Sequence, residues 1–184
     1  MTTPTAAGNA ANAANAATNL VDEPLACARR GWAVFPVHWI RDAPADSGLE
    51  FVCSCLDPVC PSPGKHPLTQ SGVLDATTNN DTIRTWWKLS PKANYGIQCG
   101  AESGRVVLDI DPRNGGDVEL EDLCGKHGQL PDTVQVLTGG GGFHYYFQHP
   151  GTRVKSSPLA AGLDLKADGG YVVGPGSRHA SGRT

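Results

Sequence analysis

The sequence has no apolar run long enough to cross a bilayer, and it does not open with a basic segment followed by an apolar stretch. A membrane-spanning helix needs about 20 mostly apolar residues, and a secretion signal needs both of those parts. We therefore expect a cytoplasmic protein. The net charge is also small, at −3 over 184 residues, because acidic and basic residues nearly balance. This balance excludes a strongly basic protein that coats nucleic acid, although it leaves room for an enzyme whose acidic cluster offsets basic residues elsewhere.

The chain lacks internal repeats, and its length suits one globular domain. Residues 1–19 contain almost no large apolar side chain and are predicted to form a disordered tail, which leaves residues 20–184 as the domain. The 23 glycines and 14 prolines favour turns and short strands over a helical bundle. Because the last residues are as rich in turn formers as the middle of a domain, we expect the chain to be part of a longer protein.

Hydrophobic periodicity and capping residues predict a mixture of helices and strands. Helices are expected over residues 22–30, about 80–90 and 117–126. Strands are expected over residues 33–37, 94–100, 105–111, 133–137, 143–147, 163–165 and 171–173. Residues 94–100 and 105–111 are predicted to pair as a hairpin, and residues 41–72 to form an inserted loop. This order indicates an α+β fold rather than a doubly wound parallel sheet.

Two aspartates, Asp109 and Asp111, lie at the end of the apolar strand Arg105-Val-Val-Leu-Asp-Ile-Asp. Side chains alternate along a strand, so both carboxylates leave it on one face. Two such charges in proximity repel by about 4 kcal/mol at an effective dielectric constant near 20, which favours a divalent cation between them. In the alternative interpretation, Asp111 caps the turn before Pro112 and Asp109 is a solvated strand end.

Three thiols and one imidazole lie within fourteen positions, at Cys53, Cys55, Cys60 and His66. Three cysteines and one histidine make a closed tetrahedral set of the kind that binds structural Zn²⁺. The surrounding segment, about residues 50–68, is too poor in apolar residues for a core of its own, so the metal would be its main source of order. The alternative is a loop with three free cysteines. The other three cysteines, at positions 27, 99 and 124, are predicted to be ordinary core residues.

A glycine loop, Thr138-Gly-Gly-Gly-Gly-Phe-His144, runs into a predicted strand. Glycines such as Gly141 and Gly142 let backbone N–H groups approach a phosphate closely, although the lysine of a Walker A motif is absent. The loop is also compatible with a flexible hairpin turn. His144 follows it directly and can pair with a triphosphate or have a purely structural role, whereas His149 is expected on the surface.

A third acid, Asp164, shares one face of a short predicted strand with Lys166. A further carboxylate would complete a two-metal site, and the lysine could meet a phosphate as a point charge. The alternative is a surface ion pair of small energetic consequence. Asp168 competes for the role of third acid, but its position before Gly169-Gly170 suits a loop.

Taken in order, these segments resemble the bifunctional primase–polymerase domain of phage and plasmid replication proteins, within the archaeo-eukaryotic primase superfamily. The resemblance covers about residues 24–182. Its motifs include Gly64-Lys-His-Pro67, Asn94-Tyr-Gly-Ile97, Leu108-Asp-Ile-Asp111, Gly141-Gly-Phe-His144 and Leu163-Asp-Leu-Lys166. One departure is Gly174-Pro-Gly-Ser177, which replaces the more usual paired prolines before serine.

The resemblance implies an RRM-like sheet that carries the active site. By motif, Asp109 and Asp111 match the metal-binding pair, Asp164 the third acid and His144 the nucleotide-binding histidine. The cysteine segment is similar to a zinc-binding stem. The glycine loop and Lys166 would help to hold the triphosphate.

The implied activity is template-directed nucleotidyl transfer, as a DNA primase and polymerase of a phage or plasmid in a bacterial host. Mg²⁺ or Mn²⁺ would be the catalytic metal, and a DNA template with its primer and a dNTP or NTP would be the substrates. A helicase region C-terminal to this domain is a further expected partner. Two other classes remain open: a metal-dependent nuclease and a non-catalytic zinc module that binds DNA. A rolling-circle endonuclease is disfavoured, because His144 and His149 are too far apart for a His-x-His ligand pair.

Overall fold

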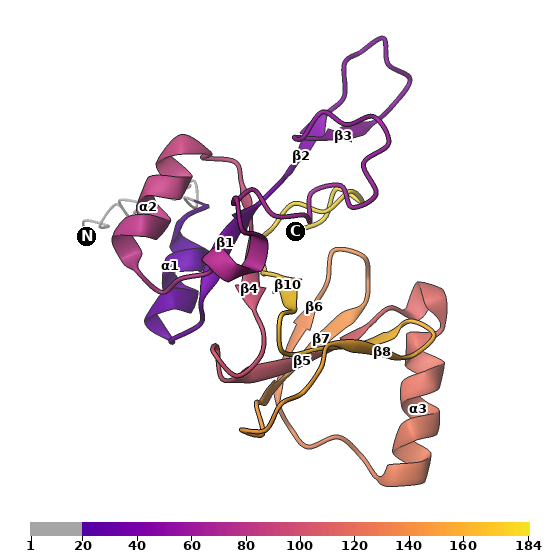
Figure 1. Cartoon of the computed structure of the whole chain (residues 1–184). Helices are drawn as coiled ribbons and strands as arrows, with labels where there is room; N and C mark the ends of the chain where they lie inside the picture. Colours follow the sequence, from indigo (N-terminus) through magenta and orange to yellow (C-terminus); the bar gives the residue numbers. More distant parts are fainter. Residues whose placement is uncertain (1–19) are drawn as a thin grey trace, which may run out of the picture.

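The computed structural model describes residues 20–184, so the predicted disordered tail lies outside the described residues. Within this part the chain forms three α-helices and ten strands (Figure 1). The helices are α1 (Asp22–Arg29), α2 (Asn80–Leu89) and α3 (Gly116–His127). The strands are β1 (Val34–Val37), β2 (Ile40–Asp42), β3 (Phe51–Cys53), β4 (Asn94–Gln98), β5 (Arg105–Ile110), β6 (Val134–Leu137), β7 (Phe143–Gln148), β8 (Ser157–Ala160), β9 (Leu163–Lys166) and β10 (Tyr171–Val173). The predicted α+β class is confirmed.

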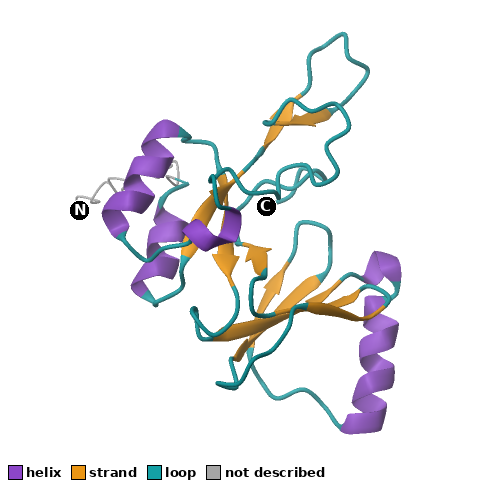
Figure 2. Cartoon of the chain, viewed as in Figure 1, coloured by secondary structure: helices purple, strands orange, loops and turns teal. Residues whose placement is uncertain are grey.

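The first sheet has three antiparallel strands in the order β1-β4-β10 and is packed against α1 and α2 (Figure 2). Helix α2 begins as its sequence predicts, because the Asn79 side chain accepts a hydrogen bond from the Thr82 N–H. Its buried face carries Ile83 and Trp87, which pack with apolar residues of α1, β1 and β4. Val107 and Tyr146 join the same cluster from the second sheet, so one core connects both sheets.

The second sheet has five antiparallel strands in the order β6-β7-β5-β9-β8. The succession β5-α3-β6-β7 provides the first half of the expected RRM-like unit. Before β9, where such a unit has a second helix, the chain forms the edge strand β8. Helix α3 covers one face of this sheet, where Leu120 and Leu123 pack on Leu108, Ile110 and Leu163.

The predicted hairpin of residues 94–100 with residues 105–111 is wrong. Strand β4 pairs with β1 and β10, whereas β5 pairs with β7 and β9, so each is a central strand of a different sheet. Only an isolated bridge between Gly100 and Arg105 joins the two segments. Local sequence predicted both strands correctly, but each strand forms its hydrogen bonds with two strands that are distant in sequence.

The expectation that residues 41–72 form a loop without regular structure was wrong in part. Strands β2 and β3 form a short antiparallel hairpin, with Ile40 opposite Cys53. This hairpin projects away from the first sheet (Figure 1). The chain then returns beside β1, where the Leu68 N–H donates to the Pro36 carbonyl. Three-residue strands are too short to show a period of two in the sequence.

No helix among residues 20–184 has the length and apolar character needed to cross a membrane.

Candidate functional site

Strand β5 places its alternate side chains on two different surfaces of the second sheet. Leu108 and Ile110 face α3 in the smaller core cluster, whereas Val107 faces the core that joins the two sheets. Asp109 lies on the Val107 face because side chains two residues apart share a face. The apolar residues of β5 therefore anchor the strand and leave Asp109 half-buried at the open end of that face.

Asp109 lies between two other predicted site residues. It is paired with His144 on β7 and with Asp164 on β9, and paired residues of antiparallel strands share a face. The His144 Nε2 is 3.4 Å from the Asp109 Oδ1, and the Lys166 Nζ is 2.9 Å from the Asp164 Oδ2. The strand pairing thus brings together four residues that the sequence separates by up to 57 positions.

His144 is 7% exposed and its Nδ1 has no hydrogen-bond partner among the described residues. Buried polar atoms normally have a hydrogen-bond partner, so a buried nitrogen without one is unusual. His144 also lines the cleft described next, together with Asp109 and Asp164. The Nδ1 atom is itself buried, so a ligand in the cleft would meet the ring at Nε2, beside Asp109.

A cleft of about 670 Å³ opens over these residues. The side of the cleft that the second sheet and the turn after β5 form is its floor. This floor is acidic, because it carries Asp109, Asp111 and Asp164 beside His144 and Lys166. Further lining comes from the turn after β5, the end of β6 and the glycine loop, residues 62–65 of the cysteine segment and residues 169–179. A volume of this size is typical of small-ligand sites.

Asp111 follows β5 and is held by the next turn. Its Oδ1 accepts hydrogen bonds from the Arg113 N–H and Nε, and its Oδ2 accepts from the Arg113 Nη2 and the Asn114 Nδ2. The Arg113 guanidinium bonds and charge hold the pKa of Asp111 below its ordinary value of 3.8. The carboxylate is therefore ionised and caps the turn, as the alternative interpretation predicted, while it lines the cleft.

The donor set Asp109, Asp111 and Asp164 is all oxygen, which fits Mg²⁺ or Mn²⁺. The three carboxylates line one cleft, but they do not all come within 4.8 Å of one another in the described part of the chain. Arg113 occupies both oxygens of Asp111. The chemistry of the set suits a divalent cation, and its closure around one would require Arg113 to release Asp111.

The glycine loop turns tightly between β6 and β7. The Gly142 N–H donates to the Thr138 Oγ1, and the Gly141 N–H donates to the Thr138 carbonyl. Gly141 has a φ of +85°, and a side chain at Gly142 would collide with the Ile110 carbonyl. Gly139 and Gly140 line the cleft, whereas Gly141 and Gly142 shape the turn behind them.

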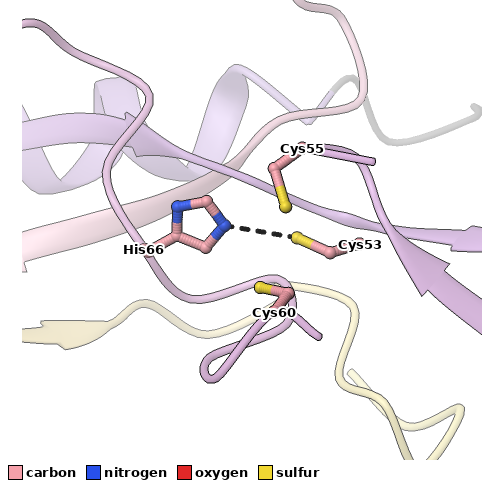
Figure 3. Close-up of side chains that lie close together, drawn as sticks. All are labelled: Cys53, Cys55, Cys60 and His66. Atoms are coloured by element: carbon pink, nitrogen blue, oxygen red, sulfur yellow. Dashed lines mark hydrogen bonds between the residues drawn. The ribbon is translucent and has the colours of Figure 1, made fainter. Parts of the chain in front are cut away.

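The cysteine segment forms the most compact group of metal-ligand side chains among residues 20–184. One ligand atom from each of Cys53, Cys55, Cys60 and His66 lies within 4.8 Å of all the others. Figure 3 shows the three sulfur atoms and the imidazole of His66 directed toward a common centre. The Cys53 Sγ is 3.3 Å from the His66 Nε2. In a tetrahedral zinc site these two atoms would be about 3.5 Å apart, so the geometry fits Zn²⁺.

The environment of this group favours the ionised thiol at Cys53 and the neutral thiol at Cys60. Burial alone would raise the pKa of Cys53, but N–H donors from Cys55 and Gly64 and the contact with His66 outweigh it and bring the pKa to about 7. Burial and the neighbouring thiols raise the pKa of Cys60 to about 11, because two adjacent thiolates repel. A cation at the centre would remove that repulsion. His38 stacks on His66 with ring centroids 4.1 Å apart and holds the ligand ring in place.

Asp168, the competing third acid, has a different position and role. Its carboxylate accepts hydrogen bonds from the Ala101 and Val154 N–H groups and lies 3.2 Å from the His149 Nε2. It ties the connection between the two sheets to the segment before β8. The expectation that His149 is a surface residue was wrong, because it is 8% exposed and packed against this carboxylate.

The remaining cysteines are partly as expected. Cys27 and Cys99 are buried in the main core, and burial raises the pKa of Cys99 to about 12. Cys124 is half-buried on α3 and is a member of neither core cluster, so its assignment to the core was wrong.

The cleft-lining residues that sequence reasoning missed include Lys65, Arg113 and His179. Two of them adjoin recognised motifs, since Lys65 precedes the ligand His66 and Arg113 follows Asp111-Pro112. Proximity to a motif was a usable signal for these two. His179 carried no such signal, because it reaches the cleft only through the path of the C-terminal segment.

In this α+β domain, three aspartates of the second sheet and the turn after it, the glycine turn and residues 62–65 of the cysteine segment line one cleft. The chain matches the family model of the bifunctional DNA primase/polymerase, N-terminal domain, over residues 24–184, and belongs to this family. Its class of activity is accordingly DNA primase/polymerase-type nucleotidyl transfer in replication. No curated protein matches the chain.

Proposed function

We propose that this domain extends a primer on a DNA template by a two-metal mechanism, in the replication of a phage or plasmid. The single observation that supports this most strongly is the ladder His144–Asp109–Asp164 across three paired strands, beside Asp111 in one cleft. Family membership supports the reaction class, and the neighbouring positions of Asp109 and Asp164 on paired strands support the assignment of these acids.

Asp109, Asp111 and Asp164 would hold the divalent ions. When bound, such ions lower the pKa of an attacking 3′-hydroxyl and stabilise the leaving pyrophosphate. Lys166 would provide a point charge for phosphate, steadied by Asp164 until the nucleotide arrives.

His144 would bind the nucleotide from the sheet side of the cleft. Its Nε2 lies beside Asp109 at the cleft and would be the nitrogen that meets a phosphate, because its Nδ1 is buried. The N–H groups of Gly139 and Gly140 would approach the phosphates, with Gly141 and Gly142 holding the turn.

The Cys3His group would bind one structural Zn²⁺. All four ligands are supplied by the protein, so no coordination position is left for a substrate. The metal would order the segment around the β2–β3 hairpin, which has only Cys53 and Ile40 among the buried apolar residues.

The test is extension of a labelled primer on a single-stranded template with dNTPs and Mg²⁺ or Mn²⁺. We expect the wild type to extend, and Asp109→Asn to lose at least a hundredfold in rate with its fold and zinc content intact. Asp122→Asn is the matched control, because Asp122 is an exposed aspartate on α3 paired with Lys126, outside the cleft lining. Equal extension by wild type and Asp109→Asn would refute the proposal. Cleavage of DNA without nucleotides, abolished by Asp109→Asn, would indicate a nuclease instead.

A further inference from the structure

The cysteine segment contributes one wall of the cleft as well as a metal group. Residues 62–65 line the cleft opposite the sheet, and Lys65 is exposed there, immediately before the ligand His66. The backbone at this point is fixed, because the Asn94 Nδ2 donates to the Gly64 carbonyl at 2.9 Å and the Tyr171 hydroxyl donates to the Lys65 carbonyl at 3.1 Å. These two bonds hold the backbone of Lys65 on one side and the zinc ligand His66 would hold it on the other, while its side chain is free to meet a ligand.

Asn94 also ties the cysteine segment to the C-terminal segment. Its Nδ2 donates to the Arg178 carbonyl, and its Oδ1 accepts from the Arg178 N–H, both at 2.9 Å. Asn94 is only 4% exposed, so these bonds are shielded from water and their loss would leave buried groups unpaired. The Arg178 side chain adds an ion pair to Asp42 on β2. Two segments that are far apart in sequence thus form one continuous wall.

Basic side chains lie along this wall and the neighbouring glycine loop, across from the acidic residues of the second sheet. His179 packs on Gly139, Arg113 lies beside Gly140, and Arg183 is near Gly141. Burial and then the charges of Lys65, Arg113 and Arg183 lower the pKa of His179, against a smaller opposite effect of Asp111. Lys65 makes no ion pair within the described residues, so its charge is uncompensated.

We propose that Lys65 is a phosphate-binding residue for the triphosphate of the incoming nucleotide, held over the cleft by the zinc-ordered cysteine segment. The inference rests on the proposed function and deepens it, because it makes the cysteine segment part of the nucleotide site. A cleft of about 670 Å³ suits one mononucleotide rather than a duplex. Lysine binds phosphate as a compact point charge, and the carboxylates that would hold the ions chelated by a triphosphate lie across the same cleft.

The test measures dNTP binding by calorimetry with Mg²⁺ and no primer, using the full zinc-loaded chain. We expect Lys65→Met to raise the Kd for dNTP about tenfold, and to raise the Kd for inorganic tripolyphosphate by the same factor. Lys126→Met is the matched control, because Lys126 is an exposed lysine on α3 that does not line the cleft, and it should leave both affinities unchanged. Zinc content, measured on each sample, should stay at one per chain.

The phosphate could instead belong to the DNA backbone, so binding of a single-stranded oligonucleotide is measured in parallel. Weaker oligonucleotide binding with unchanged dNTP affinity in Lys65→Met would overturn the nucleotide assignment. An unchanged dNTP affinity with zinc retained would overturn the subsite altogether. Primer extension by the wild type separates the two proposals. If the wild type extends primers but Lys65→Met binds dNTP normally, only the role of Lys65 is refuted. If the wild type does not extend primers but its dNTP binding depends on Lys65, only the proposed function is refuted.

Coupling to zinc is tested with Cys60→Ser, which removes one metal ligand. We expect Cys60→Ser to weaken dNTP binding about as much as Lys65→Met, and the double variant to be no weaker than either single one. Mutations that act through one interaction are non-additive in this way, whereas independent effects add. Additive losses would contradict the claim that zinc acts on the nucleotide through Lys65.

Discussion

The guanidinium of Arg113 binds both carboxylate oxygens of Asp111, with its Nε 2.9 Å from Oδ1 and its Nη2 2.9 Å from Oδ2. The same oxygens are the ones that a divalent cation would need. Arg113 also lies beside Gly140 at the cleft, so it could move from the carboxylate toward a phosphate without leaving the site. Arg113 and a bound divalent cation would therefore compete for Asp111.

Replacing Arg113 by Met should therefore strengthen Mn²⁺ binding in the absence of nucleotide. We expect a gain of about two- to fivefold, because exposed ion pairs contribute little. Electron paramagnetic resonance of free Mn²⁺ gives the affinity directly. Lys126→Met is the control, since it breaks an ion pair of the same kind on α3. Unchanged or weaker binding by Arg113→Met would show that Asp111 is not a ligand or that Arg113 positions it.

His144→Ala should raise the Kd for dNTP about tenfold, the effect of losing one charge-assisted hydrogen bond. Primer extension at saturating dNTP should fall much less. Fluorescence or calorimetric titration measures the first quantity, and steady-state extension the second. A normal Kd combined with lost turnover would instead give His144 a role in the chemical step.

Cys60→Ser should lower bound zinc from about one per chain to well below one, because three remaining ligands bind the metal less tightly. Hydrogen exchange should then accelerate at residues 40–68, whereas β5 and β7 should remain protected. A colorimetric zinc assay and exchange mass spectrometry measure these changes. Cys124→Ser, outside the group, should retain the metal and native exchange.

Asp168→Asn should destabilise the fold in a pH-dependent manner. Bonds from the Ala101 and Val154 N–H groups, and then the charge of His149, lower the pKa of Asp168 below its ordinary value of 3.8. A depressed folded pKa means that the carboxylate contributes stability above about pH 4 and loses it as the pH falls through the folded value. Asparagine offers one acceptor oxygen in place of two and turns its NH₂ toward one of the N–H donors.

The urea midpoint of Asp168→Asn should therefore lie below that of the wild type at pH 6, and the difference should shrink below pH 4. A constant difference would contradict this assignment.

Gly142→Ala should lower stability by about 1–3 kcal/mol, because its Cβ would collide with the Ile110 carbonyl and push β5 away from β7. Gly125→Ala is the contrast, since a Cβ at Gly125 meets nothing within 4 Å and alanine is the better helix former. That variant should gain about 0.5–1 kcal/mol. Urea unfolding measures both. Equal stabilities would mean that the glycine loop adapts freely and does not need glycine at this position.

The sequence by itself determined most of the local structure. The β-branched, apolar run from Val106 to Ile110 predicted β5, and the alternation of side chains along a strand puts Asp109 on the face opposite Leu108 and Ile110. Cap residues predicted the start of α2, and the spacing of three cysteines and one histidine predicted the compact group that the structure contains. These features depend on residues close together in the chain, where side-chain alternation and turn chemistry act directly.

Tertiary structure decided which strands became neighbours and which side chains met. Strand β4 was expected beside β5, yet each acquired two partners distant in sequence, and only this pairing placed His144 and Asp164 on either side of Asp109. The burial of His149, the Asn94 link and the approach of Lys65 to the cleft depend on the same long-range pairing. A strand's periodicity specifies its faces but not its partners, because any strand edge offers the same N–H and C=O groups until packing of the whole core selects among them.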